Sequence, residues 1–419
     1  MPHRNITKKQ ALDYHEFPRP GKISVESTKP VVTQKDLSLA YTPGVATPCL
    51  EIEKKPENAY KYTSKGNLVA VISNGTAVLG LGNIGAIASK PVMEGKGVLF
   101  KSFSKLDAFD IEVDTEDVDT FCNTVRAIAP TFGGINLEDI KSPECFEIER
   151  RLVEELDIPV MHDDQHGTAV ISAAAIINAC QITEKQLCTL EVVVVGAGAA
   201  AISCARLYRH LGVKKISMID SKGVVHSGRS DLNIYKREFA IESYKTHAEV
   251  FESADVVLGL SQPGSFSIDD VKSMNEHPIV FALSNPIPEV FPDEVLKARP
   301  DAIVATGRSD FDNQVNNVLG FPFIFRGAMD VRARKINIEM KVAAAKALAK
   351  LAREEVPDYI NEIYGKKITF GTDYIIPKPF DKRLLVEISS AVALAAIETG
   401  SAVSKDFNIE AYKEELAQL

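Results

Sequence analysis

The 419-residue chain is longer than a single compact core usually supports, so we expect two domains. Its formal net charge of −9 and its scattered lysines argue against a nucleic-acid partner, because phosphate recognition needs clustered Lys and Arg. No apolar run approaches the ~18 residues of a membrane span, and the first residues lack the apolar core of a signal peptide. We therefore expect a cytoplasmic protein without a membrane partner.

The first half of the chain alternates between strand-like and helix-like segments. After a stretch rich in Pro, Lys and Thr, the pattern predicts strands over residues 68–75, 97–103 and 133–139, and a short element over 109–113. A helical stretch runs through Pro91 to Lys96, an amphipathic helix is expected over 117–129, and a further apolar run over 158–167 ends on acids. This alternation is typical of an α/β domain with a mostly parallel sheet.

The second half repeats the alternation and then becomes helical. A helix over 168–179 leads to strands that begin at Glu191 and continue over 214–220, 255–261, 278–286 and 302–307, with Ala-rich helices over 340–352 and 384–398. We therefore expect an α/β fold in two domains with a helical return. The divisions are a substrate domain over 1–163, a Rossmann domain over 164–316, and a C-terminal helical segment over 317–419 that packs back on the first domain.

Six cysteines occur without any CxxC spacing, and several lie in apolar runs. We expect them to be reduced and to pack as small hydrophobes. They are Cys49, Cys122, Cys145, Cys180, Cys188 and Cys204.

A dinucleotide motif follows the strand that begins at Glu191. Gly196, Gly198 and Ala201 form GxGxxA, in which the first glycine makes the turn and the second lets backbone approach the pyrophosphate. Ala199 and Ala200 would open the helix whose N-terminus holds the phosphates. Asp220 ends the next expected strand at the usual distance for a ribose-binding acid, so we predict NAD or NADP binding.

A second glycine-rich segment, with Gly80, Gly82 and Gly85, also fits the dinucleotide pattern. Lys101 and Ser102 stand near the end of the strand expected next, where a ribose-binding acid would be needed. We therefore predict a turn of the substrate domain that packs close to the ligand.

Two pairs of acids follow apolar strands, Glu138-Asp139 and Asp163-Asp164. Acids at the carboxyl ends of strands can bind Mg²⁺ or Mn²⁺, although Asp also caps helices routinely. Two pairs in one domain favour the metal. His162 and His166 flank the second pair, and without zinc-site spacing we expect them to pack or to form hydrogen bonds.

Two further residues are candidates for proton transfer. Lys96 precedes an expected strand, and a lysine desolvated near other charges can act as a base, although most lysines are solvated. Tyr41 stands before Thr42-Pro43-Gly44, a turn that could aim its hydroxyl, and a half-buried packing role is equally open.

Several segments together resemble those of bacterial malic enzymes, in the family's order and over most of the chain. They are YTPGVA (41–46), VISNGTAVLGLGNIG (71–85), PVMEGKGVLFK (91–101), FDIEVD (109–114), INLEDIKSPECFEIE (135–149), HDDQHGTA (162–169), FALSNP (281–286) and NQVNNVLGFPFIFRG (313–327). The resemblance implies oxidation and decarboxylation of (S)-malate to pyruvate and CO₂ with reduction of NAD(P).

By the same resemblance, each motif residue has an expected role. Glu138, Asp139 and Asp164 would bind the metal, Lys96 would be the general base and Tyr41 the general acid, and Asp163 would help set the protonation of the lysine. Asn285, with Asn316 or Asn317, would hold substrate and nicotinamide. Family members of this kind suggest a homodimer.

Two departures and the choice of cofactor accompany the resemblance. Ala77 stands where animal-type relatives have a substrate-binding Arg, so Arg308 is a candidate replacement. The chain stops where longer bacterial relatives carry a phosphotransacetylase-like domain, as expected for a short form or a truncated chain. Asp220 favours NAD, but Ser221-Lys222 and Lys236-Arg237 can meet a 2′-phosphate, so NADP is preferred.

Two other functions fit parts of the sequence. A two-domain amino-acid dehydrogenase that uses a lysine would need no metal. A catalytically silent NAD(P)-binding sensor would bind cofactor without turnover, and Tyr41, Lys96 and the paired acids argue against it.

Overall fold

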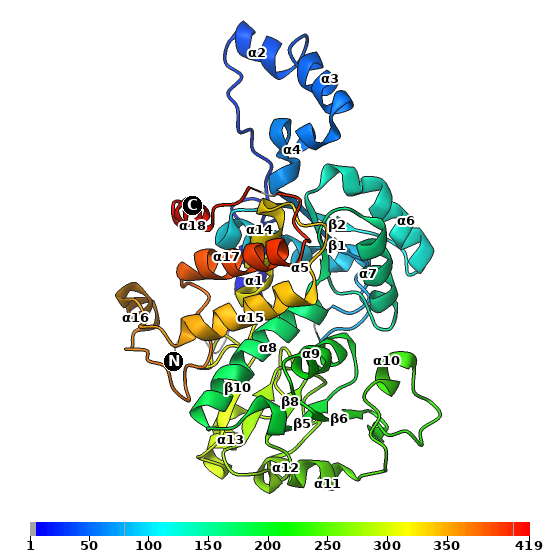
Figure 1. Ribbon diagram of the computed structural model, residues 1–419, viewed down its shortest axis with the longest axis vertical. Coiled ribbons are helices and arrows are strands. Elements are labelled where there is room, and N and C mark those ends of the chain that lie inside the picture. The colour runs from blue at the N-terminus through cyan, green and yellow to red at the C-terminus, as the bar shows by residue number, and fades with distance from the viewer. Residues whose placement is uncertain (1–5, 79, 405) are drawn as a thin grey trace.

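The computed structural model describes residues 6–78, 80–404 and 406–419. Residues 1–5, on which the expected lack of a signal peptide partly rests, and Leu79 in the glycine-rich segment lie outside these ranges. Two sheets organise the chain, with strand orders β2-β1-β3-β4 and β10-β9-β8-β5-β6-β7. In Figure 1 helices surround both sheets, which gives the α/β architecture expected from the sequence.

The first sheet is wholly parallel, and its central strand β1 is buried along its length. Its strands are β1 (Leu68–Ser73), β2 (Asp107–Glu112), β3 (Gly134–Leu137) and β4 (Val160–His162). The connecting helices are α5 (Ala86–Leu99), α6 (Val118–Ile128) and α7 (Glu144–Glu155). Asp117 caps α6 by accepting a hydrogen bond from Thr120 N–H at 2.8 Å, which explains where this predicted helix begins.

The strand predicted over 97–103 is wrong. Helix α5 continues to Leu99, and Phe100–Ser104 extends it as a π-helical turn, η3. Phe100 is fully buried and packs edge-on against Phe321 and Phe325, with ring centroids 4.8 and 5.4 Å apart. This long-range aromatic cluster, which local propensity does not reveal, favours the helical path. The next strand is β2, and it ends on Glu112 rather than at Lys101.

The second sheet contains the other predicted strands. They are β5 (Glu191–Val195), β6 (Lys215–Asp220), β8 (Val256–Gly259), β9 (Ile279–Ala282) and β10 (Ile303–Thr306), joined by the two-residue antiparallel strand β7 (Gly223–Val224). The helices of this half are α8 (Asp163–Ile182), α9 (Ala199–His210), α10 (Ile234–Arg237), α11 (His247–Glu252), α12 (Ile268–Ser273) and α13 (Pro292–Ala298). Helix α8 is longer than predicted at both ends and connects the two sheets.

The C-terminal part is helical, as its Ala-rich runs predict. It comprises α14 (Phe321–Asp330), α15 (Ile338–Ala352), α16 (Asp358–Tyr364), α17 (Arg383–Glu398) and α18 (Ile409–Ala417). Asn178 joins α8 to α15 and to the segment between α16 and α17, because its amide donates to the carbonyls of Ala349 and Ile375 at 2.9 and 2.8 Å. Among the described residues, no helix is long and apolar enough to cross a bilayer.

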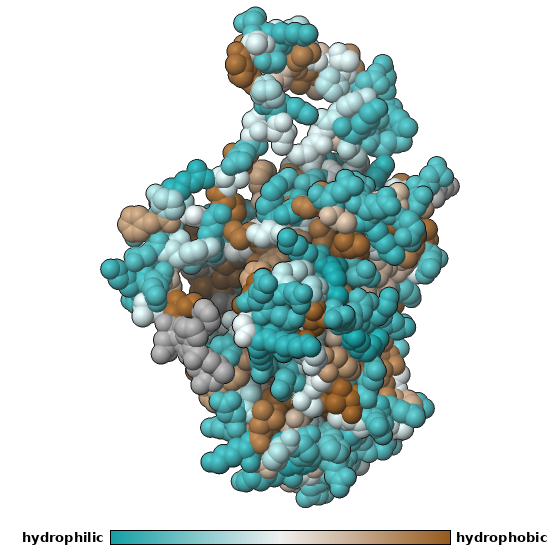
Figure 2. Space-filling model, turned by 90° about the vertical axis from the view of Figure 1, so that its left-hand side faces the viewer, coloured by the Kyte–Doolittle hydropathy of each residue, from teal (hydrophilic) through white to brown (hydrophobic). Residues whose placement is uncertain are grey.

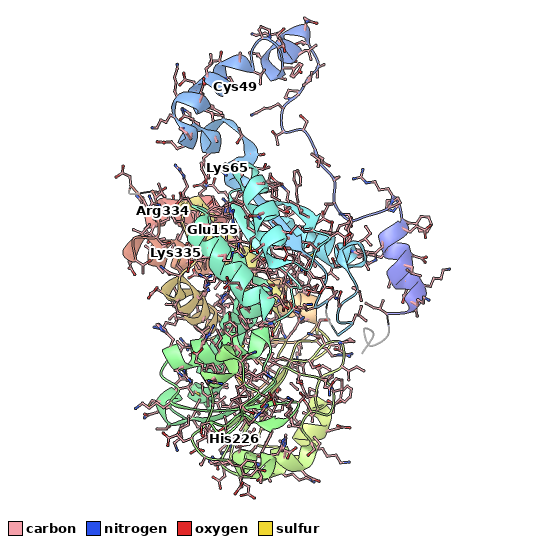
Figure 3. All side chains as sticks on the ribbon, turned by 90° about the vertical axis from the view of Figure 1, so that its right-hand side faces the viewer. Cys49, Lys65, Glu155, His226, Arg334 and Lys335 are labelled. Atoms are coloured by element: carbon pink, nitrogen blue, oxygen red, sulfur yellow. The ribbon has the colours of Figure 1, made fainter. Side chains whose placement is uncertain are left out.

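An N-terminal arm, residues 28–62, stands out from the body of the molecule. It contains α2 (Gln34–Ala40), α3 (Ala46–Lys54) and α4 (Ala59–Tyr62), and none of its residues is buried. Helix α1 (Lys8–Glu16) precedes it. Figure 3 places Cys49 on the arm and Lys65 near its base. Apolar side chains are visible on the arm in Figure 2, and Val32 and Leu39 are 84% and 64% exposed.

The six cysteines are all free thiols. Cys122, Cys145, Cys180 and Cys204 are buried, whereas Cys49 and Cys188 are exposed. The packing role expected of the cysteines therefore applies to these four.

Candidate active site

The carboxyl ends of β3 and β4 bring the two acid pairs together. Glu138 and Asp139 directly follow β3, and Asp163 and Asp164 open α8 directly after β4. Because β3 and β4 are neighbours in a parallel sheet, their carboxyl ends lie side by side, as in ligand sites of open α/β folds. Glu138, Asp139 and Asp163 are buried there.

Lys96 reaches this group of acids from helix α5. Its Nζ lies 2.5 Å from Asp163 Oδ2 and 2.9 Å from Glu138 Oε1, and 4.6 Å from the centroid of the Phe321 ring. Burial alone would lower the pKa of Lys96, but the charges of Asp163, Glu138 and Asp164 outweigh burial and raise it. Lys96 is therefore protonated as long as no bound cation offsets the charge of these carboxylates.

Glu138, Asp139 and Asp164 fit a divalent cation. Each offers an oxygen, and these oxygens lie within 4.8 Å of one another. Burial, and after it the negative charges of the neighbouring acids, raise the pKa of Glu138 despite the opposing effect of Lys96. One ammonium thus faces three carboxyl groups, and a set of hard oxygen donors such as Glu138, Asp139 and Asp164 suits Mg²⁺ or Mn²⁺.

Asn317 holds the carboxylate of Asp163, which is expected to help set the protonation of Lys96. Its Nδ2 donates to Asp163 Oδ2 at 3.1 Å, and its Oδ1 accepts from the Thr168 hydroxyl at 3.0 Å. Gly167 must remain small, since a Cβ there would lie 1.9 Å from Asp163 Oδ1. Asn316 instead caps the 3₁₀ turn that follows it, by accepting from Val318 N–H at 3.1 Å.

The glycine-rich turn of the first half packs against the loop that carries Asn285. A Cβ at Gly80 would lie 2.7 Å from the Asn285 carbonyl oxygen, and one at Gly307 would lie 2.6 Å from Asn285 Nδ2. Asn285 follows β9, so this contact joins the two sheets beside the site. Close packing explains the glycines at 80 and 307.

The GxGxxA segment forms the predicted strand–turn–helix. Gly196 follows β5 with φ +122°, and a Cβ there would lie 2.5 Å from the Leu260 carbonyl oxygen, so glycine is required. Gly198 is the N-cap of α9, whose first residues are Ala199, Ala200 and Ala201. A cavity of about 340 Å³ opens beside this turn, and Ser142 and Pro143 from the first half also line it.

Asp220 ends β6 at the wall of this cavity, but two cations already occupy its carboxylate. Arg229 binds it through two nitrogens at 2.8 and 3.0 Å, and Lys236 Nζ lies 2.7 Å from Oδ2. Burial opposes ionisation, yet Arg229 and Lys236 lower the pKa of Asp220 to about 2. Arg229 could not be predicted from the sequence, because its position nine residues after Asp220 matches none of the motifs considered above.

The remaining basic candidates differ in position. Ser221 and Lys236 line the cavity together with Asn233. Lys222 Nζ pairs with Asp231 at 3.0 Å, and Arg237 donates to the Leu232 carbonyl at 3.4 Å. Neither of these two residues is among those lining the cavity.

Comparisons with known proteins identify the family. Residues 20–118 and 114–153 match the model of the malic enzyme N-terminal domain, and residues 165–365 match that of the malic enzyme NAD-binding domain. A protein of Halomonas elongata, named NADP-dependent malic enzyme, is 59% identical over 399 residues, covering 94% of each chain. The chain belongs to the malic enzyme family.

Two other members of the malic enzyme family bear on length and fold. A probable NADP-dependent malic enzyme of Rickettsia prowazekii is 57% identical over 98% of this chain, which spans only 54% of that protein. The chain thus covers about half the length of this relative. The crystal structure of the malic enzyme from Pyrococcus horikoshii superposes with a TM-score of 0.89 at 42% identity, covering 98% of this chain and 95% of that one.

Tyr41, the general acid expected from the malic enzyme resemblance, is not brought to Lys96. It ends helix α2 on the N-terminal arm, and 69% of the residue is exposed. In Figure 1 α2 lies at the far end of the arm, away from α5. The other expected catalytic and metal-binding residues meet at one place, and Tyr41 is the exception.

Arg308 has its own partners. Its guanidinium binds Asp310 through two nitrogens at 2.8 Å each and donates to the Pro286 carbonyl at 2.8 Å. Ala77, where animal-type relatives have Arg, donates its backbone N–H to the Asp139 carbonyl at 3.0 Å.

His166 forms a hydrogen bond with Glu149, in agreement with the hydrogen-bonding role expected for it in the absence of zinc-site spacing.

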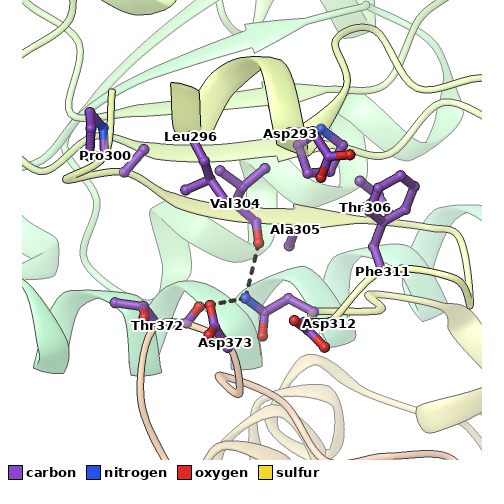
Figure 4. Close-up of a pocket in the computed structure, with 13 residues that line it drawn as sticks. Asp293, Leu296, Pro300, Val304, Ala305, Thr306, Phe311, Asp312, Thr372 and Asp373 are labelled. Carbon is purple, nitrogen blue, oxygen red and sulfur yellow. Dashed lines mark hydrogen bonds between the residues drawn. The ribbon is translucent and has the colours of Figure 1, made fainter. Parts of the chain in front are cut away.

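A further cavity of about 230 Å³ lies at the outer edge of β10, and none of the predicted site residues lines it. Figure 4 shows it between α13, β10 and the loop at Thr372 and Asp373. The Asn313 amide holds this loop to the strand by donating to the carbonyls of Val304 and Thr372 at 2.9 and 2.7 Å.

Proposed function

We propose that this chain converts (S)-malate and NADP⁺ into pyruvate, CO₂ and NADPH with the help of Mg²⁺ or Mn²⁺. The observation that carries this proposal is the position of Lys96 between Asp163 and Glu138, at 2.5 and 2.9 Å, beside the other two acids of the oxygen cluster. A proton-transfer lysine next to a set of hard-cation ligands suits an alcohol oxidation followed by loss of a carboxylate. The names of two relatives support the same reaction.

Glu138, Asp139 and Asp164 would hold the metal ion. When bound, the ion supplies positive charge that orients the substrate oxygens and stabilises negative charge as CO₂ leaves. Its charge also offsets the acids that keep the pKa of Lys96 high. Lys96 can then be neutral at the start of the reaction, as a general base must be.

In the oxidation step, Lys96 would accept the proton of the malate C2 hydroxyl, and a bound nicotinamide would supply the acceptor for the C2 hydride. Asp163 orients the ammonium that forms, since its Oδ2 already accepts a hydrogen bond from Lys96. Asn317 also holds this carboxylate, by donating its Nδ2 hydrogen to the same oxygen. The roles of Asn285, Asn316 and Asn317 as contacts to substrate or nicotinamide remain our proposal from the family motifs.

In the second step the C3–C4 bond breaks, CO₂ leaves, and C3 of the enol form of pyruvate takes up a proton. Tyr41 is our candidate for the donor, with Lys96 returning its proton to the tyrosine. The N-terminal arm does not hold Tyr41 near Lys96 of the same chain. We therefore propose a homodimer in which the arm of one subunit carries Tyr41 to the site of the other.

NADP is the proposed cofactor, because Asp220, the acid at the wall of the cavity beside Gly196, is already paired with two cations. Arg229 and Lys236 neutralise Asp220, which leaves no free carboxylate to accept from a ribose 2′-hydroxyl. Lys236 and Ser221, which line the cavity, would meet a 2′-phosphate. Lys222, next along the chain and paired with Asp231, is a further candidate. We also propose the division into domains over 1–163 and 164–316 with a return over 317–419, which the two separate sheets support.

The direct test measures reduced cofactor at 340 nm after mixing malate and Mn²⁺ with either NADP or NAD. Turnover that is faster with NADP and abolished by EDTA is expected. A chain that binds NADPH but produces no pyruvate would instead be a silent sensor. Malate oxidation that survives exhaustive EDTA treatment would contradict the metal role, since a lysine-based dehydrogenase of the amino-acid type needs no metal.

A further inference from the structure

Glu149 is a buried carboxylate on α7 that lies behind the acid pair at 163 and 164. Its side chain is 13% exposed, and both of its oxygens accept hydrogen bonds. Oε1 accepts from the backbone N–H of His162 at 2.9 Å, and Oε2 lies 2.9 Å from His166 Nε2. Because a carboxylate can only accept, Nε2 is the nitrogen that donates.

The two hydrogen-bond donors of Glu149 lie on either side of the acid pair in the sequence. His162 is the last residue of β4, and His166 lies one turn into α8, so Asp163 and Asp164 stand between them. His162 is also the N-cap of α8, yet no side chain caps the helix there. A carboxylate bound to that backbone N–H supplies the negative charge that the N-terminus of a helix favours.

The surroundings keep Glu149 ionised. Burial by itself would raise its pKa, but His166, Lys341 of α15 and His162 together lower the pKa to about 2. His166 contributes the hydrogen bond from its Nε2, which joins the first turn of α8 to Glu149 of α7. Three elements, α7, α8 and α15, therefore meet at one anion directly behind the proposed metal ligands.

We propose that Glu149 is a positioning residue for the metal site, which fixes the first turn of α8 so that Asp163 faces Lys96 and Asp164 faces Asp139. The contact that this turn must preserve is short: Asp164 Oδ2 accepts from Asp139 N–H at 2.8 Å. The inference rests on the proposed function in that Asp164 binds the metal. Residues that hold metal ligands from behind commonly change metal affinity 10- to 100-fold.

The test measures Mn²⁺ binding to the full chain without substrate, by electron paramagnetic resonance of the free ion. Glu149→Leu, which removes both acceptors, should weaken Mn²⁺ binding about tenfold or more. Glu149→Gln should keep most of the affinity, because its amide oxygen still accepts from His162 N–H and His166 can present its other tautomer. Glu147→Gln is the matched control, since Glu147 lies on the same helix and pairs with Arg150 on the surface.

NADPH binding and the thermal midpoint separate positioning from general loosening of the fold. The proposal expects Glu149→Leu to lose Mn²⁺ affinity while NADPH affinity stays within about twofold, and His166→Leu, a milder variant, to lose less. Unchanged Mn²⁺ affinity in both variants, or a parallel loss of NADPH affinity, would overturn it. A wild-type chain that binds NADPH but no Mn²⁺ would overturn the proposed metal function together with this inference.

Discussion

Lys96 shows how one side chain depends on its neighbours for its chemistry. Three acids raise its pKa although it is buried against the Phe321 ring. The same residue in water would be a protonated lysine with no catalytic use. Its function therefore requires both the acids that hold it in place and a cation that offsets them.

Replacing Lys96 by Ala should lower kcat by about 10²- to 10⁴-fold, which is the usual contribution of a general acid–base group. NADPH affinity should change little, because the dinucleotide cavity is lined by other residues. Steady-state kinetics and NADPH fluorescence titration measure the two quantities. Lys101→Ala is the control, since Lys101 lies a few residues along the same helical segment and its side chain is 63% exposed. A near-normal kcat for Lys96→Ala would refute the assigned role.

Arg229 is expected to control the choice between NADP and NAD. Arg229→Ser should leave the Asp220 carboxylate with Lys236 as its one cationic partner among those described here, so that its uncompensated charge repels a 2′-phosphate and it can accept from a ribose hydroxyl. Loss of a charged hydrogen bond of about 1.5–3 kcal/mol corresponds to a 10- to 100-fold fall in the NADP-to-NAD ratio of kcat/KM. Adding Asp220→Asn should restore part of the ratio. Equal ratios in the wild type and Arg229→Ser would exclude Arg229 from specificity.

At the scale of elements, α8 joins the two halves of the chain and carries Asp163 and Asp164 on its first turn. Its interior includes one polar anchor, Asn178, which donates to two carbonyls and accepts from Arg353 Nη1 at 2.9 Å. The residue is fully buried. The α8–α15 contact therefore depends on hydrogen bonds as well as on apolar packing.

Asn178→Ala should destabilise the fold by about 2–5 kcal/mol, because it removes the amide that donates to two carbonyls in the interior. The urea midpoint of unfolding measures this change. The exposed Asn123→Ala should change stability by no more than about 0.5 kcal/mol. An Asn178→Ala midpoint equal to that of the control would show that water replaces the lost contacts.

The elements also show which secondary structure a sequence pattern can predict. Apolar runs such as those of β1 and β5 are buried in parallel sheets and were predicted closely. Residues 97–103 have a similar composition, yet they are helical because Phe100 packs against Phe321 and Phe325, more than 200 positions along the chain. A contact of that separation leaves no local signal.

At the scale of the whole molecule, the N-terminal arm stands out from the body and contacts it near its base, where the Arg332 guanidinium lies 4.2 Å from the centroid of the Tyr60 ring. None of its residues is buried, and apolar side chains such as Val32 are exposed. An exposed apolar segment of this kind is typical of a subunit interface. A two-fold dimer would bury both arms equivalently.

Mixed dimers test whether the arm serves the other subunit. Tyr41→Phe and Lys96→Ala homodimers should each be nearly inactive. After random subunit exchange, about a quarter of wild-type activity should return, because half of the subunits lie in mixed dimers and one of the two sites in each has both residues. If the arm served its own subunit, mixing would restore no activity.

By itself, the sequence determined the α/β class, the dinucleotide turn at Gly196 and the two acid pairs, because these features depend on residues that are neighbours along the chain. Only the tertiary structure decided that Lys96 lies between Asp163 and Glu138, that Arg229 and Lys236 neutralise Asp220, and that Tyr41 stands apart on an arm. Those relations join side chains from separate elements, and the energies that fix them, burial and charge pairing, act through space.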